Sequence, residues 1–505
     1  MQLGNSQPSP QSPQTLAMPV PGARSALALL LFINLFNYID RQILSAVLPR
    51  LQLDGTLFSP SDPLLQFKLG TLTSAFLFSY MLFSPIVGWL DGHGYRRWII
   101  LGFGVTIWSL ASGASGFATS YLMLLFTRCI VGIGEGAYAP VASALLSDAY
   151  PPRHRGAVLA IFNMAIPVGS ALGFVIGGLV SDYYDDWRHA FWFTFSGLFI
   201  GVFCFMRKEL PRPEFKANRS TALSYWGVLK TLRTIRSFVF CCIGMTAITY
   251  VLGGVAAWGP TYIFQREARF NLSAETLELM ENPPEELKRL PVPHEYIEQL
   301  RPKADGVERD LPTLKTHLGE LIETDDGKLY FERLTTAATT KSSMSSGLIA
   351  TIFGGIIVVG GLIATAFGAW LGERLRTKVR GAYFLVIGGG ALLAFPAFVA
   401  FLYMPLPWGW VALFITVLGL FAHTGPGNTI LANVVTTEMR ATAFAINILV
   451  IHALGDVISP PIIGAVADFS SLQTSMLITS FFVVIGGVIW LFGARYLDDD
   501  TRRVS

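Results

Sequence analysis

Twelve apolar runs divide the chain, and each is about as long as a helix that crosses a lipid bilayer. A helix rises about 1.5 Å per residue, so the roughly 30 Å hydrocarbon core needs about 20 apolar residues. A backbone in lipid must satisfy its own hydrogen bonds, and these runs lack the period-two pattern of a barrel, so we predict helices. The runs lie at roughly 26–48, 68–90, 98–117, 121–147, 157–181, 190–206, 237–264, 347–371, 381–403, 408–434, 442–466 and 473–494.

The composition supports a membrane protein and excludes several other classes. Only 14% of the residues are charged, whereas a soluble domain carries about a quarter. The net charge of +3 gives no indication of a nucleic-acid partner, and we expect none. The four cysteines fall inside apolar runs and read as buried hydrophobes, so we expect neither a disulfide framework nor a metal. No phosphate-binding glycine loop occurs, so we expect no cofactor and an ion or substrate gradient as the energy source.

Basic residues in the loops predict the orientation. Loops after even-numbered runs carry them, such as Arg96 and Arg97 after run 2 and Arg374 after run 8. The loops after runs 3, 9 and 11 carry no Lys or Arg. We therefore expect a multi-pass protein of a bacterial inner or plasma membrane, with both termini in the cytoplasm.

The segments outside the runs divide the chain further. Between runs 7 and 8 lies an extracytoplasmic insertion, 266–345, rich in Glu, Asp and Pro. It is too long for an ordinary connection, so it is either a small cap or a mobile loop. The predicted parts are a disordered cytoplasmic tail (1–23), an N-terminal six-helix bundle (24–206), a cytoplasmic linker (207–236), a C-terminal six-helix bundle containing the insertion (237–494) and a cytoplasmic tail (495–505).

The two halves repeat each other. After run 4 come Arg155, then Gly169, Gly178 and Asp182; after run 10 come Arg440, then Gly455, Gly464 and Asp468 at almost the same spacings. Two six-helix halves related by repetition are typical of secondary transporters. We predict an all-α membrane fold of twelve transmembrane helices in two pseudo-symmetric six-helix bundles.

Several motifs resemble the major facilitator superfamily. They are Asp91-x-x-Gly94-x-Arg96-Arg97 after the second run, Arg128-x-x-x-Gly132-x-Gly134 in the fourth, and the glycine series from Gly169 to Gly178 in the fifth. In that superfamily the loop Asp pairs across the cytoplasmic face and holds the outward-facing state closed. The copy here departs from the pattern, because Gly92 stands where a basic residue is usual. The resemblance implies a set of gating residues, namely Asp91, Arg96, Arg97, Glu373 and Arg374.

Three further segments resemble the Spinster family within that superfamily. They are Asn37-Tyr38-Ile39-Asp40-Arg41, Gly134-Glu135-Gly136-Ala137-Tyr138, and His452-Ala-Leu-Gly-Asp456 followed by Ser459-Pro460. Members of the family move lysophospholipids and sphingosine 1-phosphate-type lipids, and several are linked to protons. The resemblance implies a monomeric secondary transporter that moves a small amphipathic lipid through the bilayer by alternating access. The insertion at 266–345 is not part of the usual family pattern.

Ionisable side chains at membrane depth are costly and indicate function. Asp40 lies about sixteen residues beyond Arg24, which places it roughly 24 Å along its helix. Glu135 and Arg128 are about two turns apart, so they share one helix face. Burial raises the pKa of a carboxyl group, whereas a nearby Arg lowers it. The balance of the two effects can bring the pKa of such a group toward neutral pH. We predict that Asp40 and Glu135 are proton sites and that Arg128 is their shared counter-ion or an anchor for an anionic head group; a static ion network is the alternative.

Other polar and aromatic residues of the runs are candidates for the substrate path. Adjacent helix residues point about 100° apart, so Arg41 need not pair with Asp40. His452 and Asp456 are one turn apart and face the same way, which fits either a polar site or a helix–helix hydrogen bond. The predicted substrate-binding set is Arg41, Tyr38, Tyr138, Tyr250, His452, Asp456 and Asn433.

Other functions remain open at this point. A multidrug or small organic-anion exporter would carry the same motifs, because the motifs identify the type of transporter better than its substrate. A transporter-fold sensor or receptor would use the insertion for ligand binding. A membrane enzyme is disfavoured, because the sequence shows no nucleophile–base pair or metal cluster, and we predict no enzyme activity.

Overall fold

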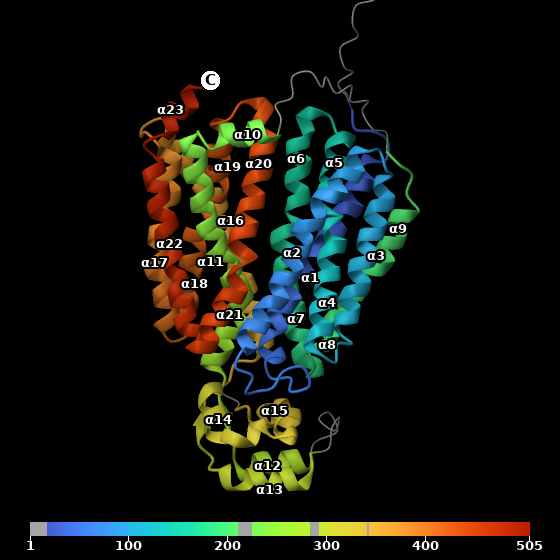
Figure 1. Ribbon diagram of the computed structural model, residues 1–505, viewed down its shortest axis with the longest axis vertical. Coiled ribbons are helices and arrows are strands. Elements are labelled where there is room, and N and C mark those ends of the chain that lie inside the picture. Colours follow the sequence, from blue (N-terminus) through green and yellow to red (C-terminus); the bar gives the residue numbers. More distant parts are fainter. Residues whose placement is uncertain (1–17, 211–224, 283–291, 341–342, 505) are drawn as a thin grey trace, which may run out of the picture.

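The computed structural model of the protein describes all residues except 1–17, 211–224, 283–291, 341–342 and 505. The described residues contain twelve helical spans that are long and apolar enough to cross a membrane, as predicted. They form two bundles that stand side by side, and a small helical unit lies at one end of the pair (Figure 1). We call this end the cap end and the opposite end, which holds α10 and α23, the linker end.

The N-terminal bundle contains six spans, several of which are broken into two helices. Its helices are α1 (Ala23–Leu51), α2 (Leu65–Gly92), α3 (Arg97–Ser115), α4 (Tyr121–Gly136), α5 (Ala139–Ala149), α6 (Pro152–Asn163), α7 (Ala165–Tyr184), α8 (Arg188–Phe195) and α9 (Gly197–Phe205). Spans four and six continue through short breaks, from α4 into α5 and from α8 into α9. The tryptophans Trp98 and Trp108 are almost fully buried in its core.

The C-terminal bundle follows the same plan. Its helices are α10 (Tyr225–Leu232), α11 (Arg236–Glu267), α16 (Ser346–Arg376), α17 (Ala382–Tyr403), α18 (Trp408–Phe421), α19 (Thr424–Asn433), α20 (Thr437–Ile451), the π-helical turn η4 (His452–Asp456), α21 (Ser459–Phe469), α22 (Leu472–Gly493) and α23 (Leu497–Arg502). The eleventh span runs from α20 through η4 into α21. Trp258 and Trp490 are buried in this half.

The insertion forms a folded cap over its described residues. A two-residue antiparallel pair joins β1 (Phe270–Asn271) to β2 (Glu308–Arg309). Its helices are α12 (Ala274–Glu281), α13 (His294–Leu300), η2 (Arg301–Lys303), α14 (Leu311–Leu318), η3 (Gly319–Glu323) and α15 (Asp325–Ala338). Ser273, Asp310 and Thr324 accept backbone hydrogen bonds that begin three of these helices, a common signal for a helix start.

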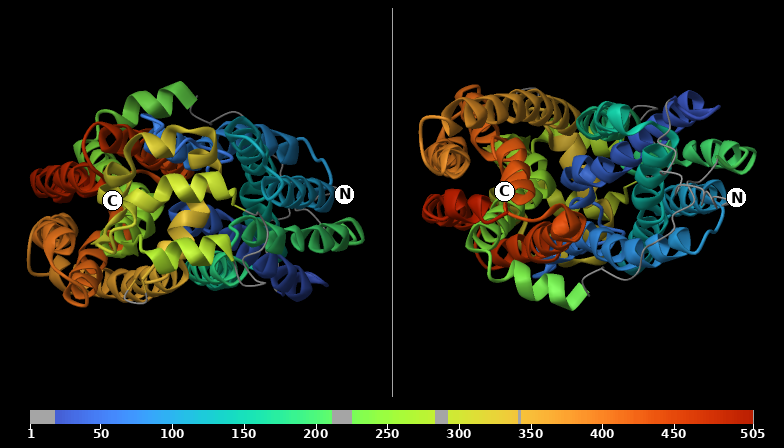
Figure 2. Two further views of the ribbon diagram at one scale, coloured as in Figure 1. Left: turned by 90° about the horizontal axis from the view of Figure 1, so that it is seen from below. Right: turned by 90° about the horizontal axis from the view of Figure 1, so that it is seen from above.

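The cap lies across the end of the two bundles (Figure 2), and its buried apolar residues are continuous with the core of the bundles. Tyr296, Leu314 and Phe331 are fully buried in the cap. Although the cap connects α11 to α16 of the C-terminal bundle, the Lys315 ammonium donates to the Pro60 carbonyl of the N-terminal bundle at 2.9 Å. Of the two forms left open by the sequence, the described part is therefore a cap that touches both halves.

The two bundles contact each other at the cap end. There α7 packs on α16 and α2 packs on α21. The Gln265 amide donates to Gln52 at 2.8 Å, and the Ser74 hydroxyl donates to the Val457 carbonyl across the same interface. These contacts between the bundles therefore lie at the end that the cap covers.

Candidate proton and substrate site

Asp40 of α1 and Arg128 of α4 form one buried acid–base pair inside the N-terminal bundle. Their relative exposures are 1% and 2%, and Arg128 Nη1 lies 3.9 Å from Asp40 Oδ2. The Ser112 hydroxyl of α3 donates to the other oxygen of Asp40. Arg128 Nη2 donates to the Ser115 hydroxyl at 2.7 Å. Two serines of α3 therefore hold an acid and a base whose charges are too far apart for a direct hydrogen bond.

Glu135 of α4 and Arg41 of α1 form a second and tighter pair. Arg41 Nε donates to Glu135 Oε2 at 2.7 Å, and the Glu135 side chain is fully buried. The Arg41 side chain is 16% exposed, so it is the more accessible member of this pair. Among the described residues, Glu135 Oε1 accepts no hydrogen bond. A buried carboxylate with one unused oxygen has room for a proton.

Aromatic rings surround the Arg41 guanidinium. Its central carbon lies 4.8 Å from the Tyr38 ring, 5.2 Å from the Phe76 ring and 4.8 Å from the Tyr80 ring. Ring faces attract a cation, and they do so more strongly where water is excluded. The cage of aromatic rings therefore holds Arg41 in position. The ring faces do not use up the remaining N–H groups of Arg41, which can donate to a bound anion.

The pairing differs from the predicted one in an important respect. We predicted Arg128 as a counter-ion shared by Asp40 and Glu135, and Arg41 as a substrate contact. In direct contacts each carboxylate has its own arginine, with Arg128 beside Asp40 and Arg41 bonded to Glu135, whereas the charge of Arg128 acts on both carboxylates, as predicted. The reason for the direct pairing is the placement of α1 relative to α4, which brings the long Arg41 side chain of α1 to the level of Glu135 on α4.

His452 and Asp456 lie together on the C-terminal side. His452 Nδ1 is 2.9 Å from Asp456 Oδ2 within η4, and the two side chains are 37% and 17% exposed. A π-helical turn often occurs at a functional site, because it displaces side chains from their regular register. The next residue, Val457, accepts the Ser74 hydrogen bond from α2, so the pair lies next to the contact between the bundles.

Three of the predicted substrate residues lie elsewhere. Tyr138 is buried in the bundle core, where its hydroxyl donates to the Leu30 carbonyl at 2.5 Å and its ring packs on Trp108. Tyr250 stacks on Phe482 of α22 at 4.4 Å and lines an apolar groove rather than the Arg41 cage. Asn433 is exposed at the end of α19. Packing requirements of each bundle, which the sequence pattern does not reveal, account for these positions.

The predicted gating residues lie at the linker end, where the following pairs each lie within one bundle. Arg97 donates to Asp91 at 2.7 and 3.0 Å and to Asp148 at 2.7 Å, whereas Arg96 is exposed. Glu373 accepts from the Tyr383 hydroxyl at 2.6 Å and pairs with Arg376 at 2.6 Å. The Arg374 guanidinium lies 5.3 Å from the Trp370 ring.

Sequence reasoning missed four residues of the site. Ser112 and Ser115 lie on one face of α3, and the signal for them is a hydroxyl residue at every third position, in the series Thr106, Ser109, Ser112 and Ser115. Phe76 and Tyr80 lie one turn apart on α2 and give no signal beyond ordinary helix amphipathicity. Each is identified only by the packing of a neighbouring helix against α1 or α4.

Two six-helix bundles stand side by side, and the N-terminal one holds two buried acid–arginine pairs. The family model described as the Major Facilitator Superfamily matches residues 30–280 and 311–503. The chain therefore belongs to the major facilitator superfamily and is a transporter rather than an enzyme. The match omits 281–310, which lies inside the insertion.

Within that superfamily the chain is similar to Spinster proteins. It is 29% identical over 521 residues to Protein spinster homolog 3 of Danio rerio, covering 98% of this chain and 90% of that protein. It is 28% identical over 512 residues to Protein spinster homolog 1 of Homo sapiens, covering 95% and 83%. It is 26% identical over 504 residues to the Sphingosine-1-phosphate transporter SPNS2 of Danio rerio, covering 95% and 86%.

A solved structure supports the same fold. The bacterial homolog to the human lysosomal transporter Spinster, in an inward-facing and unoccupied conformation, superposes with a TM-score of 0.69 at 19% identity. The superposition covers 95% of this chain and 98% of that one. At this identity the likeness establishes the fold.

Proposed function

We propose that the protein is a proton-coupled transporter of an amphipathic lysophospholipid or sphingolipid-like substrate. The observation that carries the proposal is the bond between Glu135 and Arg41 inside an aromatic cage. Glu135 occupies one edge of the Arg41 guanidinium through Nε. A phosphate head group would compete with Glu135 for Arg41, because guanidinium binds carboxylate and phosphate in the same forked geometry.

This competition couples a proton to the substrate. A proton on Glu135 removes its charge and weakens its hold on Arg41, which then binds the anionic head group. Departure of the proton restores the internal pair and expels the head group. Asp40 and Arg128 form a second acid–arginine pair in the same bundle, which Ser112 and Ser115 hold in place and where a second proton can bind. His452 and Asp456 offer polar contacts from the opposite bundle.

The similarity to transporters of lysolipid-like molecules supports the lipid cargo. One relative bears the name of a sphingosine-1-phosphate transporter. We further propose a monomer in a bacterial inner membrane, with the linker end and both termini in the cytoplasm, since the basic loops lie at that end. The cap then faces the extracytoplasmic side.

Flux in liposomes tests the proposal. The purified protein is reconstituted and offered a fluorescent lysophospholipid or a small organic anion, with and without a proton gradient. We expect lysophospholipid flux that the gradient accelerates. Asp40→Asn and Glu135→Gln are expected to reduce that acceleration by about tenfold, within the usual range of coupling between two sites. Glu298→Gln, on an exposed cap helix, is the matched control and leaves it unchanged.

Each alternative has a distinct outcome in the same experiment. Flux of the small anions without lysophospholipid flux would favour an exporter of that class. Saturable binding of the lysophospholipid without flux would favour a sensor. An unchanged pH dependence in both Asp40→Asn and Glu135→Gln would exclude these carboxyl groups as the proton sites.

A further inference from the structure

The repeat between the two halves ends in the same short pattern. Gly178 precedes Asp182 by four residues at the cap end of α7, and Gly464 precedes Asp468 by four residues at the cap end of α21. Residues four apart share one helix face. In each half, a glycine and an aspartate therefore face the opposite bundle together.

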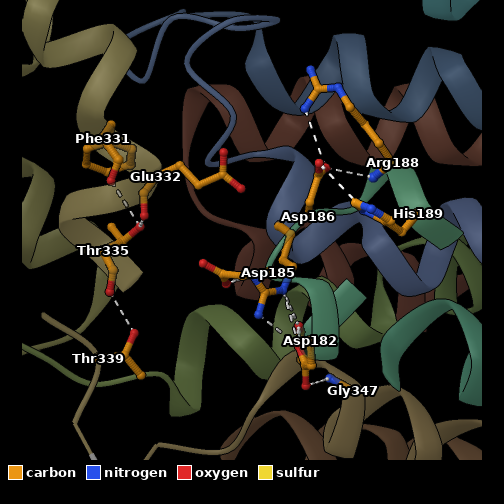
Figure 3. A network of polar contacts seen from close by, with 12 residues as sticks. Asp182, Asp185, Asp186, Arg188, His189, Phe331, Glu332, Thr335, Thr339 and Gly347 are labelled. Atoms are coloured by element: carbon orange, nitrogen blue, oxygen red, sulfur yellow. Dashed lines mark hydrogen bonds and ion pairs between the residues drawn. The ribbon is translucent and has the colours of Figure 1, made fainter. Parts of the chain in front are cut away.

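Asp182 of the N-terminal bundle binds the start of α16 in the C-terminal bundle. Its Oδ2 accepts from the Gly347 amide at 2.7 Å, and its Oδ1 accepts from the Ser346 hydroxyl at 2.5 Å. Figure 3 shows the Asp182 carboxylate directed at Gly347. Arg50 of the same bundle adds contacts to Oδ1 at 3.2 Å, which keep the carboxylate in place.

Asp468 of the C-terminal bundle binds the start of α2 in the N-terminal bundle. Its two oxygens accept from the Gln66 and Phe67 amides, both at 2.8 Å. The residue before α2 is Leu64, whose side chain has no acceptor for these amides. The free amides at the start of α2 therefore find their hydrogen-bond acceptor in the opposite bundle. They lose this acceptor whenever the bundles separate at this end.

The two glycines make these contacts possible. A Cβ on Gly178 would lie 2.7 Å from the Gly347 Cα, and a Cβ on Gly464 would collide with the Gln66 carbonyl oxygen. In both places the aspartate reaches a helix start only because the backbones cross with no side chain between them. The same device thus occurs twice, with the roles of the bundles exchanged.

We propose that Asp182 and Asp468 are paired latches that close the extracytoplasmic gate and open together when the carrier turns outward. A carboxylate at a helix N-terminus meets the positive end of the helix dipole as well as free amide donors. Such a contact is strong enough to bias a two-state equilibrium and weak enough to break in each transport cycle. The latches depend neither on the cargo nor on the proton site proposed above.

Distances between the bundles test the latches. Spin labels are placed at Ser61→Cys and Ser470→Cys, which are exposed at the cap end of opposite bundles. Pulsed electron paramagnetic resonance then measures the ratio of open to closed populations in nanodiscs. We expect Asp182→Asn and Asp468→Asn each to raise that ratio by about threefold to tenfold, and the double variant to raise it further.

The matched control is Glu267→Gln at the same end of the molecule. Glu267 pairs at 2.7 Å with its neighbour Arg266 and so belongs to one bundle. This variant should leave the distance distribution unchanged. If Asp182→Asn does not fold, Ser346→Ala removes one donor to Asp182 and carries the test for that latch. An unchanged ratio in the single and double variants would overturn the proposal, and a response at only one aspartate would overturn the pairing.

Discussion

Replacing Arg128 with methionine is expected to abolish gradient-driven transport and to destabilise the N-terminal bundle. The substitution keeps a long side chain but leaves the Asp40 carboxylate buried without its counter-charge. Removing one partner of a buried ion pair typically costs about 3–5 kcal/mol. It also removes the donor to Ser115, whose hydroxyl itself donates to Thr127 at 2.8 Å. The measurements are flux in liposomes and the midpoint of thermal unfolding in detergent.

The double variant Asp40→Asn/Arg128→Met separates charge from packing. Because both charges are gone, most of the lost stability should return while transport stays absent. The control Arg374→Met removes an arginine that lies at the linker end over Trp370, and it should leave the unfolding midpoint nearly unchanged. A single variant as stable as the parent would contradict a charge pair between Asp40 and Arg128.

The sequence predicts the spanning helices well because lipid imposes a length and a composition on each of them. All twelve runs correspond to helical spans in the structure. The breaks within spans are less visible. The turn between α4 and α5 follows Gly136, next to Glu135, and the η4 turn that interrupts the eleventh span holds His452 and Asp456, yet a polar residue within a span does not by itself predict a break. Local backbone geometry there depends on packing rather than on hydropathy.

The candidate site could be predicted only in part. Charge at membrane depth singles out Asp40, Glu135 and Arg128 without any structure, because such residues are rare in lipid. The rotation of α1 relative to α4 decides which arginine lies next to which carboxylate. This rotation cannot be read from the sequence. The assignment of Arg41 to Glu135 therefore required the structure.

The same limit explains the aromatic residues. Tyr38 and Tyr138 are both tyrosines in apolar runs, beside the motifs that resemble Spinster. Tyr38 lies against Arg41, whereas Tyr138 donates to the Leu30 carbonyl in the core. A tyrosine needs a hydrogen-bond partner when buried, and the sequence does not say whether that partner is a site residue or the backbone.

Glu332 is expected to make docking of the cap onto the bundles dependent on pH. It lies on α15 and extends toward the carboxylates of Asp185 and Asp186 (Figure 3). Burial, together with Asp54 and these two aspartates, raises the pKa of Glu332 to about 8, although Arg50 opposes the shift. In an undocked cap the side chain would meet water and regain a pKa of about 4.3.

The sign of the effect follows from this difference. The pKa of Glu332 is higher in the docked state, so protonation favours docking. Docking is therefore strongest below about pH 4 and weakens as the pH rises toward about 8. Lys315 acts in a different range, because burial lowers its pKa to about 8 and its contribution changes only above that value. Between pH 5 and 7.5 the contribution of Lys315 is therefore constant, and Glu332→Gln isolates the part of the response that comes from Glu332.

Glu332→Gln should keep the cap docked throughout that range. Spin labels at Thr316→Cys on the cap and Ser61→Cys on the N-terminal bundle report docking as a distance, since both positions are exposed. In the parent, the undocked fraction should grow from pH 5 to 7.5, whereas in Glu332→Gln it should stay low and constant. Glu298→Gln, which pairs with Arg301 on the exposed face of the cap, should behave like the parent. Identical pH profiles in the parent and Glu332→Gln would show that this carboxyl group does not control the cap.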